Sequence, residues 1–326
     1  MSKLVTIYGG SGFIGRYIAR RMAKEGWRVR VAVRRPELAG FVRPYGVVGQ
    51  VEPIFCNIRD DASVCAAMHG SDAVVNCVGT FDAKGKNNFD AVQHEGAERI
   101  ARIAAEQGVS RLVHISALGA DAESESGYAR SKAEGEAAVL SHFPGAVILR
   151  PSVVFGPEDE FFNRFGAMAR FGWVLPVVGG ETRFQPVYVD DVARAAVMGA
   201  LGQAEPGVYE LGGPHVATFR ELMEDMLEII RRKRLIFNMP FWLGGLVAWL
   251  GELASILTVG LINPPVTRDQ VRQLRADNVV SEGAKGFAAL GIQPTAMEAE
   301  LPEYLWAYRP SGQYAAIKES ARNQRA

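Results

Sequence analysis

The stretch Tyr8-Gly9-Gly10-Ser11-Gly12-Phe13-Ile14-Gly15 decides the fold of this chain. The residues that lead into it, 3–8, are mostly apolar and predict a short buried strand. The residues that follow, 13–25, carry apolar side chains at helical spacing with Arg and Lys between them, which predicts an amphipathic helix. A strand, a glycine turn and a helix in this order are the context that a phosphate-binding fingerprint requires.

Three glycines explain how such a turn would hold a pyrophosphate. Gly9 permits a tight turn, Gly12 lets the backbone approach the phosphates, and Gly15 lets the helix pack against the strand. The start of the helix then offers unpaired N–H groups and the positive end of its dipole to the phosphates. The alternative is an ordinary Gly-rich turn, which the flanking strand and helix make less favourable.

Length and composition describe a globular protein without a strong charge bias. The chain has 326 residues, of which 48% are hydrophobic, and 36 Lys and Arg balance 36 Asp and Glu. This balance argues against nucleic acid as a partner. Cys56, Cys65 and Cys77 form no CxxC pair, so they indicate a reducing compartment and neither a disulfide framework nor a metal site. The first strand begins by about residue 3, so we expect no leader segment.

Apolar strands alternate with helices through the first half of the chain. Further strands are predicted at 28–33, 51–56, 73–79 and 111–115. The helices between them include 60–68 and 88–107. This alternation predicts an α/β fold with a doubly wound parallel sheet of the Rossmann type.

The end of the second strand carries a signal for the type of nucleotide. In a dinucleotide-binding unit this end faces the adenine ribose, about 20 residues beyond the glycine turn. An Asp or Glu there would bond the ribose 2′-OH, but this chain has Arg34-Arg35. Two guanidinium groups suit a 2′-phosphate dianion, so NADPH is favoured over NADH. The alternative is a solvated basic pair on a loop.

Two further strand ends are expected to line the same site. Asn57-Ile58 follows the third strand, and a polar side chain followed by an apolar one could flank an adenine. Val78-Gly79 ends the fourth strand and would open on a crevice of small residues. Because the carboxyl ends of parallel strands meet at one edge of the sheet, we expect both pairs to contact the nucleotide.

A possible acid/base group lies downstream of the fifth strand. Tyr128 and Lys132 are placed on one face of a helix by their spacing, and Ser116 follows the strand. A neighbouring Lys⁺ would lower the pKa of a Tyr from near ~10 and favour the phenolate. Tyr128 could then exchange a proton with a carbonyl/alcohol couple, while Lys132 bonds the nicotinamide ribose and Ser116 polarises the substrate oxygen. Taken alone, the Y-x-x-x-K pattern is usually an ordinary helix surface.

Together with 150–157 (RPSVVFGP) and 185–193 (QPVYVDDVA), these motifs resemble the short-chain dehydrogenase/reductase superfamily, in its extended or atypical branch. The resemblance runs from about Thr6 to Gly213. It implies a Rossmann-type nucleotide domain whose further cofactor contacts are Ser11, Phe13, Ile14, Pro151 and Val153. The connection from Ser116 to Tyr128 is shorter than in typical extended epimerases, which puts a sugar-nucleotide substrate in doubt. Tyr128 and Lys132 could then be ribose contacts only.

A narrower resemblance is carried by 158–165 (EDEFFNRF), 183–189 (RFQPVYV) and 263–271 (NPPVTRDQV). These segments are similar to the dehydrogenase-like accessory subunit of respiratory complex I, the NADH:ubiquinone oxidoreductase. The resemblance implies a bacterial member that holds NADPH without steady turnover. It places the chain in the peripheral arm, on the cytoplasmic side of the plasma membrane and near the point where quinone enters. The implied partners are other complex I subunits of that arm and of the membrane junction.

The second half of the chain differs in character. Strand signals thin out past about Gly213, which predicts a smaller, mainly helical C-terminal lobe. We therefore expect a Rossmann-type NADP(H)-binding domain over 1–213, whose later segments contribute to the lobe. The helical lobe would extend over 214–312, and a polar tail over 313–326 would be disordered in isolation.

Residues 237–262 form an unusually apolar segment. Between 241 and 262 the only charged residue is Glu252, and such a length would let a helix cross the ~30 Å hydrocarbon core. The internal glycines and the central charge argue against a span. Two interpretations stay open: a helix of the lobe that covers the cofactor crevice, or an apolar surface docked on a membrane or membrane subunit. Trp242, Trp249 and the basic run 231–234 favour docking.

Three functions are therefore compatible with the sequence. The first is an NADPH-binding accessory subunit of complex I without catalytic turnover. The second is an active NADP-dependent reductase or dehydrogenase of a hydrophobic, quinone-like molecule, with Tyr128 and Lys132 as its acid/base pair. The third is a regulator that binds NADP(H) and signals its redox state. We favour the first, on the narrower resemblance to the complex I subunit.

Overall fold

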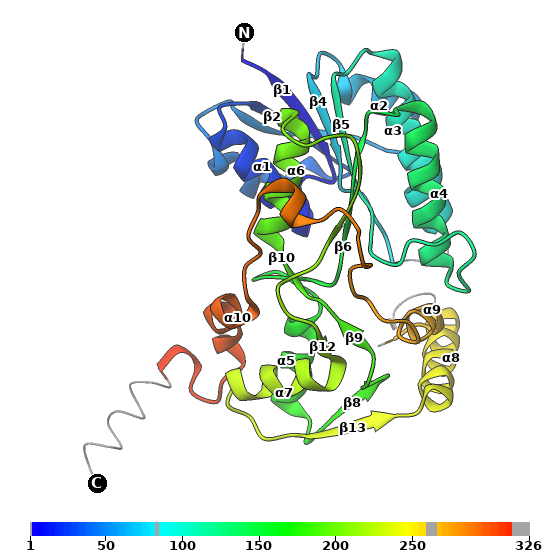
Figure 1. Cartoon of the computed structure of the whole chain (residues 1–326), viewed down its shortest axis with the longest axis vertical. Helices are drawn as coiled ribbons and strands as arrows, with labels where there is room; N and C mark the ends of the chain where they lie inside the picture. The colour runs from blue at the N-terminus through cyan, green and yellow to red at the C-terminus, as the bar shows by residue number, and fades with distance from the viewer. Residues whose placement is uncertain (1, 82–84, 259–265, 315–326) are drawn as a thin grey trace. The chain divides into compact units, whose positions relative to one another are not determined.

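The computed structural model describes residues 2–81, 85–258 and 266–314 (Figure 1). The chain divides into two compact units, each assembled from separate stretches. The first unit comprises Met1–Ser152, Val189–Gly212 and Val280–Pro294. The second unit comprises Val153–Tyr188, Gly213–Val279 and Thr295–Ala326.

The first unit is built on a seven-stranded sheet in the order β11-β6-β5-β4-β1-β2-β3. Its strands are β1 (Leu4–Tyr8), β2 (Arg28–Val33), β3 (Val51–Phe55), β4 (Ala73–Asn76), β5 (Arg111–Ile115), β6 (Val147–Pro151) and β11 (Gly207–Leu211). Neighbouring strands pair in parallel throughout. The predicted doubly wound parallel sheet is therefore confirmed. The strand order reverses at β1, between β2 and β4, where sheets of this kind bind ligands.

Helices cover both faces of this sheet. They are α1 (Phe13–Lys24), α2 (Asp61–Met68), α3 (Glu95–Glu106), α4 (Gly127–His142) and α6 (Val189–Leu201), with the shorter η1 (Pro36–Tyr45), η2 (Asp90–His94) and η3 (Phe287–Leu290). α1 packs against α6, and α3 packs against α4 (Figure 1). Adjacent residues of β5 show that the two pairs lie on opposite faces: Leu112 belongs to the core with α3, whereas Val113 contacts Gly199 of α6.

The second unit has its own aromatic core and three two-stranded sheets, β10-β7, β12-β9 and β13-β8. Its strands are β7 (Val154–Phe155), β8 (Val174–Val178), β9 (Arg183–Phe184), β10 (Val187–Tyr188), β12 (Ala217–Thr218) and β13 (Leu235–Met239). Its helices are α5 (Phe162–Phe171), α7 (Phe219–Ile229), α8 (Phe241–Leu257), α9 (Arg268–Gln273) and α10 (Met297–Leu305), with the short η4 (Trp306–Tyr308) and η5 (Gly312–Tyr314). The rings of Phe161 and Phe219 stack with centroids 5.5 Å apart near the centre of this core.

The two units interleave along the chain on both sides of the expected boundary at Gly213, and the expectation already assigned later segments of 1–213 to the lobe. Residues 153–188 belong to the second unit, and 280–294 return to the first. This exchange follows from the sheet, because β11 must pair with β6 after the chain has left the first unit and come back through α6.

The apolar segment 237–262 is only partly helical. Its first residues belong to β13, which pairs in parallel with β8, and α8 begins at Phe241. In the described part of the chain, no helix combines the length and the apolar character that a bilayer span needs. Residues 259–262 and the tail from 315 lie outside the described residues, so the expectations for them stay predictions.

Gly15→Ala tests the packing on which α1 depends. A Cβ at position 15 would lie 2.4 Å from the Gly9 carbonyl oxygen and 2.7 Å from the Gly10 Cα. Because backbone atoms cannot yield as a flexible side chain would, we expect a loss of about 1–3 kcal/mol in the free energy of unfolding, measured by urea denaturation. Gly40→Ala is the control, since an added Cβ meets no atom within 4 Å there. Equal stability of the two variants would contradict the packing argument.

Candidate functional site

A cavity of about 600 Å³ opens in the first unit where strands β1 to β4 end. The sequence predicted half of its lining, which consists of Gly9, Ser11, Gly12, Arg34, Arg35, Asn57, Ile58, Val78 and Gly79. It missed the other half, which consists of Ala32, Val33, Leu38, Cys56, Arg59, Cys77, Thr80, Asn87 and Val92. The missed residues are mostly neighbours of the predicted ones, so adjacency in sequence was the available signal.

The glycine turn forms one wall of the cavity. Gly9 has φ +73°, a left-handed conformation that glycine adopts without strain, and its N–H donates to the Ala32 carbonyl over 2.9 Å. Gly12 is the N-cap residue of α1 and has no side chain with which to cap the helix. The first N–H groups of α1 are therefore left for an anion. Phe13, Ile14 and Gly15 lie within the first turn of α1 and are not among the described residues that line the cavity.

The charge of the cavity wall is positive. Among the described residues that line it, three are arginines, Arg34, Arg35 and Arg59, and none is acidic. Arg34 and Arg35 follow the last residue of β2 and are exposed. A polyanion such as a dinucleotide suits this wall better than a neutral or cationic ligand.

Lys132 and Ser116 are buried beside the carboxyl end of β5, outside the described cavity lining. Lys132 Nζ donates to the Ile115 carbonyl over 3.2 Å, and it lies 3.7 Å from where a Cβ on Gly79 would be. Burial lowers the pKa of Lys132 to about 8, against the opposing effect of Glu136. Ser116 Oγ is buried and has no hydrogen-bond partner within the described residues. Of these groups, Lys132 approaches the lining at Gly79, and its role in the site stays a prediction.

Tyr128 lies in an aromatic enclosure. Its ring stacks on Phe81 with centroids 5.3 Å apart and meets the edge of Phe89 at 5.9 Å. Lys132 Nζ lies over the ring, 5.9 Å from its centroid. Burial raises the pKa of Tyr128 to about 12, so the expectation that Lys132 would favour the phenolate is wrong. The physical reason is that desolvation of the phenolate outweighs a cation placed over the ring face.

Two predicted contacts lie away from the described cavity lining. Pro151 is the last residue of β6, and Val153 belongs to the second unit. Tyr128 and Ser116 are likewise outside the described lining. A nucleotide role for these four residues stays a prediction.

His114 is a buried polar residue that sequence reasoning missed. The Asn76 amide nitrogen and His114 Nδ1 lie 3.1 Å apart, and the Val78 N–H donates to Asn76 Oδ1 over 3.0 Å. Because the Asn76 amide donates, Nδ1 must accept, which places the imidazole proton on Nε2. Burial, assisted by Lys132, lowers the pKa of His114 to about 3. A neutral imidazole therefore supports the backbone turn that carries Val78 and Gly79. A histidine inside an otherwise apolar strand was the available signal.

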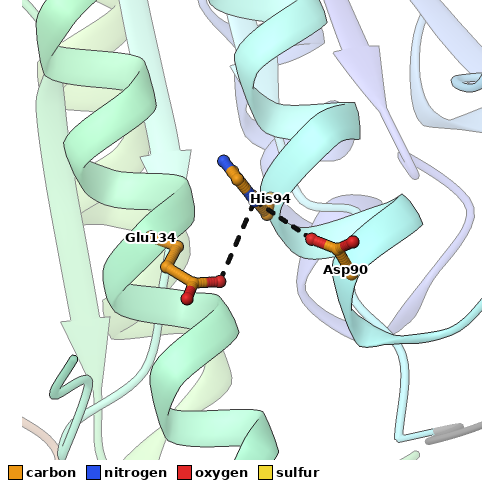
Figure 2. A group of neighbouring side chains, drawn as sticks. All are labelled: Asp90, His94 and Glu134. Carbon is orange, nitrogen blue, oxygen red and sulfur yellow. Dashed lines mark hydrogen bonds and ion pairs between the residues drawn. The ribbon is translucent and has the colours of Figure 1, made fainter. Parts of the chain in front are cut away.

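A second polar group connects η2 to α4 (Figure 2). His94 Nδ1 lies 3.0 Å from an Asp90 oxygen and 3.8 Å from a Glu134 oxygen. The ligand atoms of the three residues lie within 4.8 Å of one another, which is close enough to consider a metal ion. Both carboxylates approach the same ring nitrogen, however, as they would approach one imidazole N–H. We therefore interpret the group as an ion pair between helices.

Comparison with known proteins covers both units. The sequence pattern of the NAD dependent epimerase/dehydratase family matches residues 5–212. The mitochondrial protein named NADH dehydrogenase [ubiquinone] 1 alpha subcomplex subunit 9 is 35% identical in Arabidopsis thaliana, over 95% of this chain and 79% of that protein. The protein of the same name in Mus musculus is 31% identical, over 94% of this chain and 80% of that protein.

Other similar proteins are enzymes. A ceramide reductase of Caulobacter vibrioides is 31% identical, over 73% of this chain and 74% of that protein. The crystal structure of the Bordetella bronchiseptica enzyme WbmH in complex with NAD⁺ superimposes with a TM-score of 0.67 at 18% identity, over 96% of this chain and 100% of that one. At 18% identity, the structural similarity to WbmH supports the fold alone. The family of the chain follows instead from the sequence matches.

His114 predicts a pH dependence of stability. Its pKa is about 3 in the folded protein and near ~6.5 when unfolded, so the stabilisation is present above pH 6.5 and is lost as the pH falls toward 3. From pH 7 to pH 5 we expect the wild type to lose about 2 kcal/mol more than His114→Gln, measured by urea denaturation. His69→Gln, at an exposed histidine, should keep the wild-type pH dependence. Parallel curves for the wild type and His114→Gln would contradict the assignment.

Proposed function

We propose that this chain, which belongs to the NAD dependent epimerase/dehydratase family, is an NADPH-binding accessory subunit of respiratory complex I. One observation carries the proposal: the similarity to named subunits of this complex extends over 94–95% of the chain, well beyond the family's nucleotide domain. A protein that shared only the nucleotide-binding chemistry would not need to match through the second unit. We place the subunit in the peripheral arm, on the membrane side and near the point where quinone enters.

The preference for NADPH is supported by the basic wall of the cavity. Arg34 and Arg35 stand where β2 ends, at the position that faces the adenine ribose in this fold. No described lining residue offers a carboxylate that would bond a ribose 2′-OH and repel a 2′-phosphate. Two guanidinium groups can hold the extra phosphate by charge-assisted hydrogen bonds.

A structural role for the nucleotide is supported by the surroundings of Tyr128. A phenol whose pKa is raised to about 12 stays protonated at neutral pH and is a weaker proton donor to a substrate carbonyl than an ordinary tyrosine is. Its ring is occupied by Phe81 on one face and by the edge of Phe89. Lys132, by contrast, borders the cavity at Gly79 and could bond a ribose hydroxyl without any reaction.

Docking at the membrane junction is supported by exposed apolar side chains in the second unit. Trp173 and Phe171 are 84% and 83% exposed, and Trp242 at the start of α8 is 71% exposed. The guanidinium groups of Arg234 and Arg170 lie 5.8 Å and 5.6 Å from the Trp173 and Phe171 ring centroids. Aromatic rings with cations beside them suit the headgroup level of a bilayer. We propose that this surface, with the exposed apolar residues between Phe237 and Leu253, faces the membrane or a membrane subunit.

The second candidate is an active NADP-dependent reductase of a hydrophobic, quinone-like molecule. It is favoured by the similarity to a ceramide reductase and by the presence of Tyr128, Lys132 and Ser116. The buried Ser116 Oγ, which has no partner within the described residues, is a donor that a substrate oxygen could use.

Purification of the tagged chain from native membranes in mild detergent separates the two candidates. An accessory subunit should bring down a large assembly that contains flavin and iron–sulfur centres and oxidises NADH. Tyr128→Phe should keep this assembly and its bound NADPH, because a hydroxyl without a proton-transfer role is not needed. Recovery of the chain alone, or loss of carbonyl reduction in Tyr128→Phe, would favour the reductase.

Charge reversal at the arginine pair tests the nucleotide preference. We expect Arg34→Glu combined with Arg35→Glu to weaken NADPH binding at least roughly tenfold, since a hydrogen bond to a charged group contributes ~1.5–3 kcal/mol. NADH binding should change much less, because its ribose lacks the 2′-phosphate. Arg28→Glu is the matched control at the other end of β2. Fluorescence titration of both nucleotides makes the measurement, and an unchanged NADPH-to-NADH ratio in the double variant would refute the assignment.

A further inference from the structure

The turn that joins β3 to α2 carries three residues into the cavity lining, Asn57, Ile58 and Arg59. This turn contains little regular structure of its own. The Asn57 N–H donates to Ser63 Oγ over 2.9 Å, and the Arg59 N–H donates to Asn57 Oδ1 over 3.2 Å. Both bonds are local. At its two ends the turn is also held by the Cys56 N–H, which donates to the Val33 carbonyl over 2.9 Å, and by Arg59 Nη1, which donates to the Lys86 carbonyl over 3.0 Å. Between these points the position of the turn depends on what holds Ile58.

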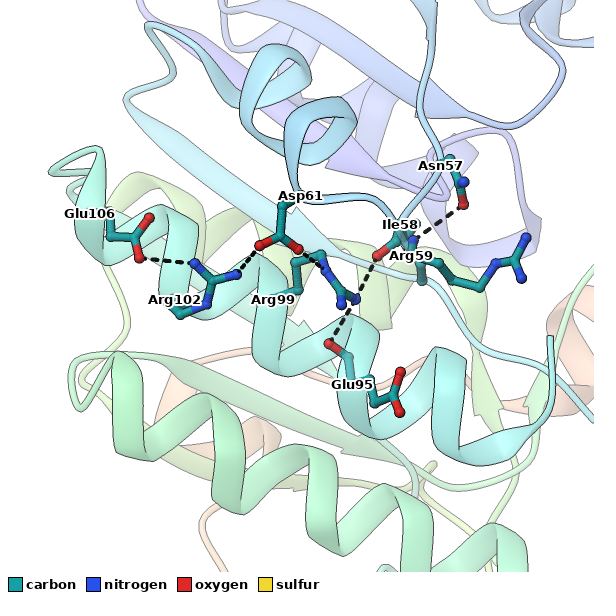
Figure 3. A network of polar contacts seen from close by, with 8 residues as sticks. All are labelled: Asn57, Ile58, Arg59, Asp61, Glu95, Arg99, Arg102 and Glu106. Carbon is teal, nitrogen blue, oxygen red and sulfur yellow. Dashed lines mark hydrogen bonds and ion pairs between the residues drawn. The ribbon is translucent and has the colours of Figure 1, made fainter. Parts of the chain in front are cut away.

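Arg99 on α3 holds the Ile58 backbone from outside the cavity (Figure 3). Its Nη1 donates to the Ile58 carbonyl over 3.1 Å and to the Glu95 carbonyl over 3.3 Å. Its Nε donates to a carboxylate oxygen of Asp61, the first residue of α2. The Arg99 side chain is only 19% exposed. One planar guanidinium therefore ties α3, the turn and α2 together at a partly buried point.

Asp61 keeps this guanidinium oriented (Figure 3). Its second oxygen accepts a hydrogen bond from Arg102 Nη2 over 2.6 Å, and Arg102 Nη1 donates to Glu106 over 2.9 Å. Arg102 thus shares Asp61 with Arg99, but neither of these two contacts reaches the cavity segment. The pair offers a matched comparison of two arginines on one helix with one common partner.

The side chain of Ile58 is held by the same helix. A Cβ at Gly96 would lie 2.7 Å from Ile58 Cδ1, so the absence of a side chain at this position makes room for Ile58. α3 therefore fixes Ile58 twice, through its carbonyl by Arg99 and through its side chain at Gly96. A turn held in this way keeps its shape before a ligand arrives, which reduces the ordering cost of binding.

We propose that Arg99 is a positioning residue that preforms the adenosine end of the nucleotide site through Ile58. The proposal rests on the nucleotide-binding function proposed above. β3 neighbours β2 in the sheet, so the turn after β3 lies beside Arg34 and Arg35 at the adenosine end. Arg99 contacts no part of the nucleotide and acts only by setting where the turn sits.

The test compares Arg99→Lys with Arg102→Lys in the full chain. A lysine ammonium cannot serve Asp61 and the Ile58 carbonyl as one planar fork does. By isothermal titration calorimetry we expect Arg99→Lys to bind 2′,5′-ADP and NADPH about tenfold more weakly than the wild type does, by the same factor for both. The NADPH-to-NADH affinity ratio should stay unchanged, because Arg34 and Arg35 are intact. Arg102→Lys should bind both probes within about twofold of the wild type.

Gly96→Ala is a second variant, which displaces the turn by pushing on the Ile58 side chain. It should weaken the binding of 2′,5′-ADP as Arg99→Lys does. Hydrogen exchange adds a readout of position: the amides of 57–59 should exchange faster in Arg99→Lys than in Arg102→Lys. Wild-type affinity for 2′,5′-ADP in Arg99→Lys would overturn the proposal. Equal losses of affinity in Arg99→Lys and Arg102→Lys would also overturn it. Failure of the wild type itself to bind either probe would instead overturn the proposed nucleotide function, and this inference with it.

Discussion

The close approach of Gly15 to the Gly9 carbonyl is the contact on which the first unit depends. A side chain at position 15 would collide with the turn, so α1 packs this closely only because glycine has none. The packing brings the first turn of α1 to the end of β1, where its N–H groups can meet an anion. β2 and β4 flank β1, so the strand ends that carry Arg34 and Gly79 arrive at the same edge. The position of the whole cavity follows from one helix–turn contact.

Three polar groups that a purely structural core would avoid are buried at or beside the carboxyl end of β5, outside the described cavity lining. Lys132, Ser116 and His114 are all buried, and burial opposes folding for groups that lack partners. His114 compensates in part by supporting Asn76 and through it the backbone at Val78. Although burial lowers its pKa to about 8, Lys132 is still mostly protonated at neutral pH. Of this set, Lys132 comes nearest to the described lining, where its Nζ lies 3.7 Å from the position of a Cβ on Gly79.

α3 has two roles in this architecture. One face of the helix contributes Ala97, Ile100 and Ala101 to the core beneath the sheet. The residues beside that face, Gly96 and Arg99, meet the turn after β3. Core contacts fix α3 against the sheet. Because Arg99 and Gly96 of this helix contact Ile58, the packing of α3 also helps to set the position of the turn. The cavity is thereby coupled to the core, which also contributes Ala32 and Cys56 to the lining directly.

The sequence by itself determined the features that depend on neighbours along the chain. The glycine turn, the alternation of strands and helices, and the positions of Arg34, Asn57 and Gly79 at strand ends are local, and strand ends of a parallel sheet share one edge. Only the tertiary structure decided what depends on distant contacts. Tyr128 meets Phe81 and Phe89, β13 pairs with β8, and Arg99 reaches Ile58 across 41 positions of sequence. Periodicity and spacing report which face a residue occupies, whereas desolvation and hydrogen bonding depend on what the folded chain brings opposite that face.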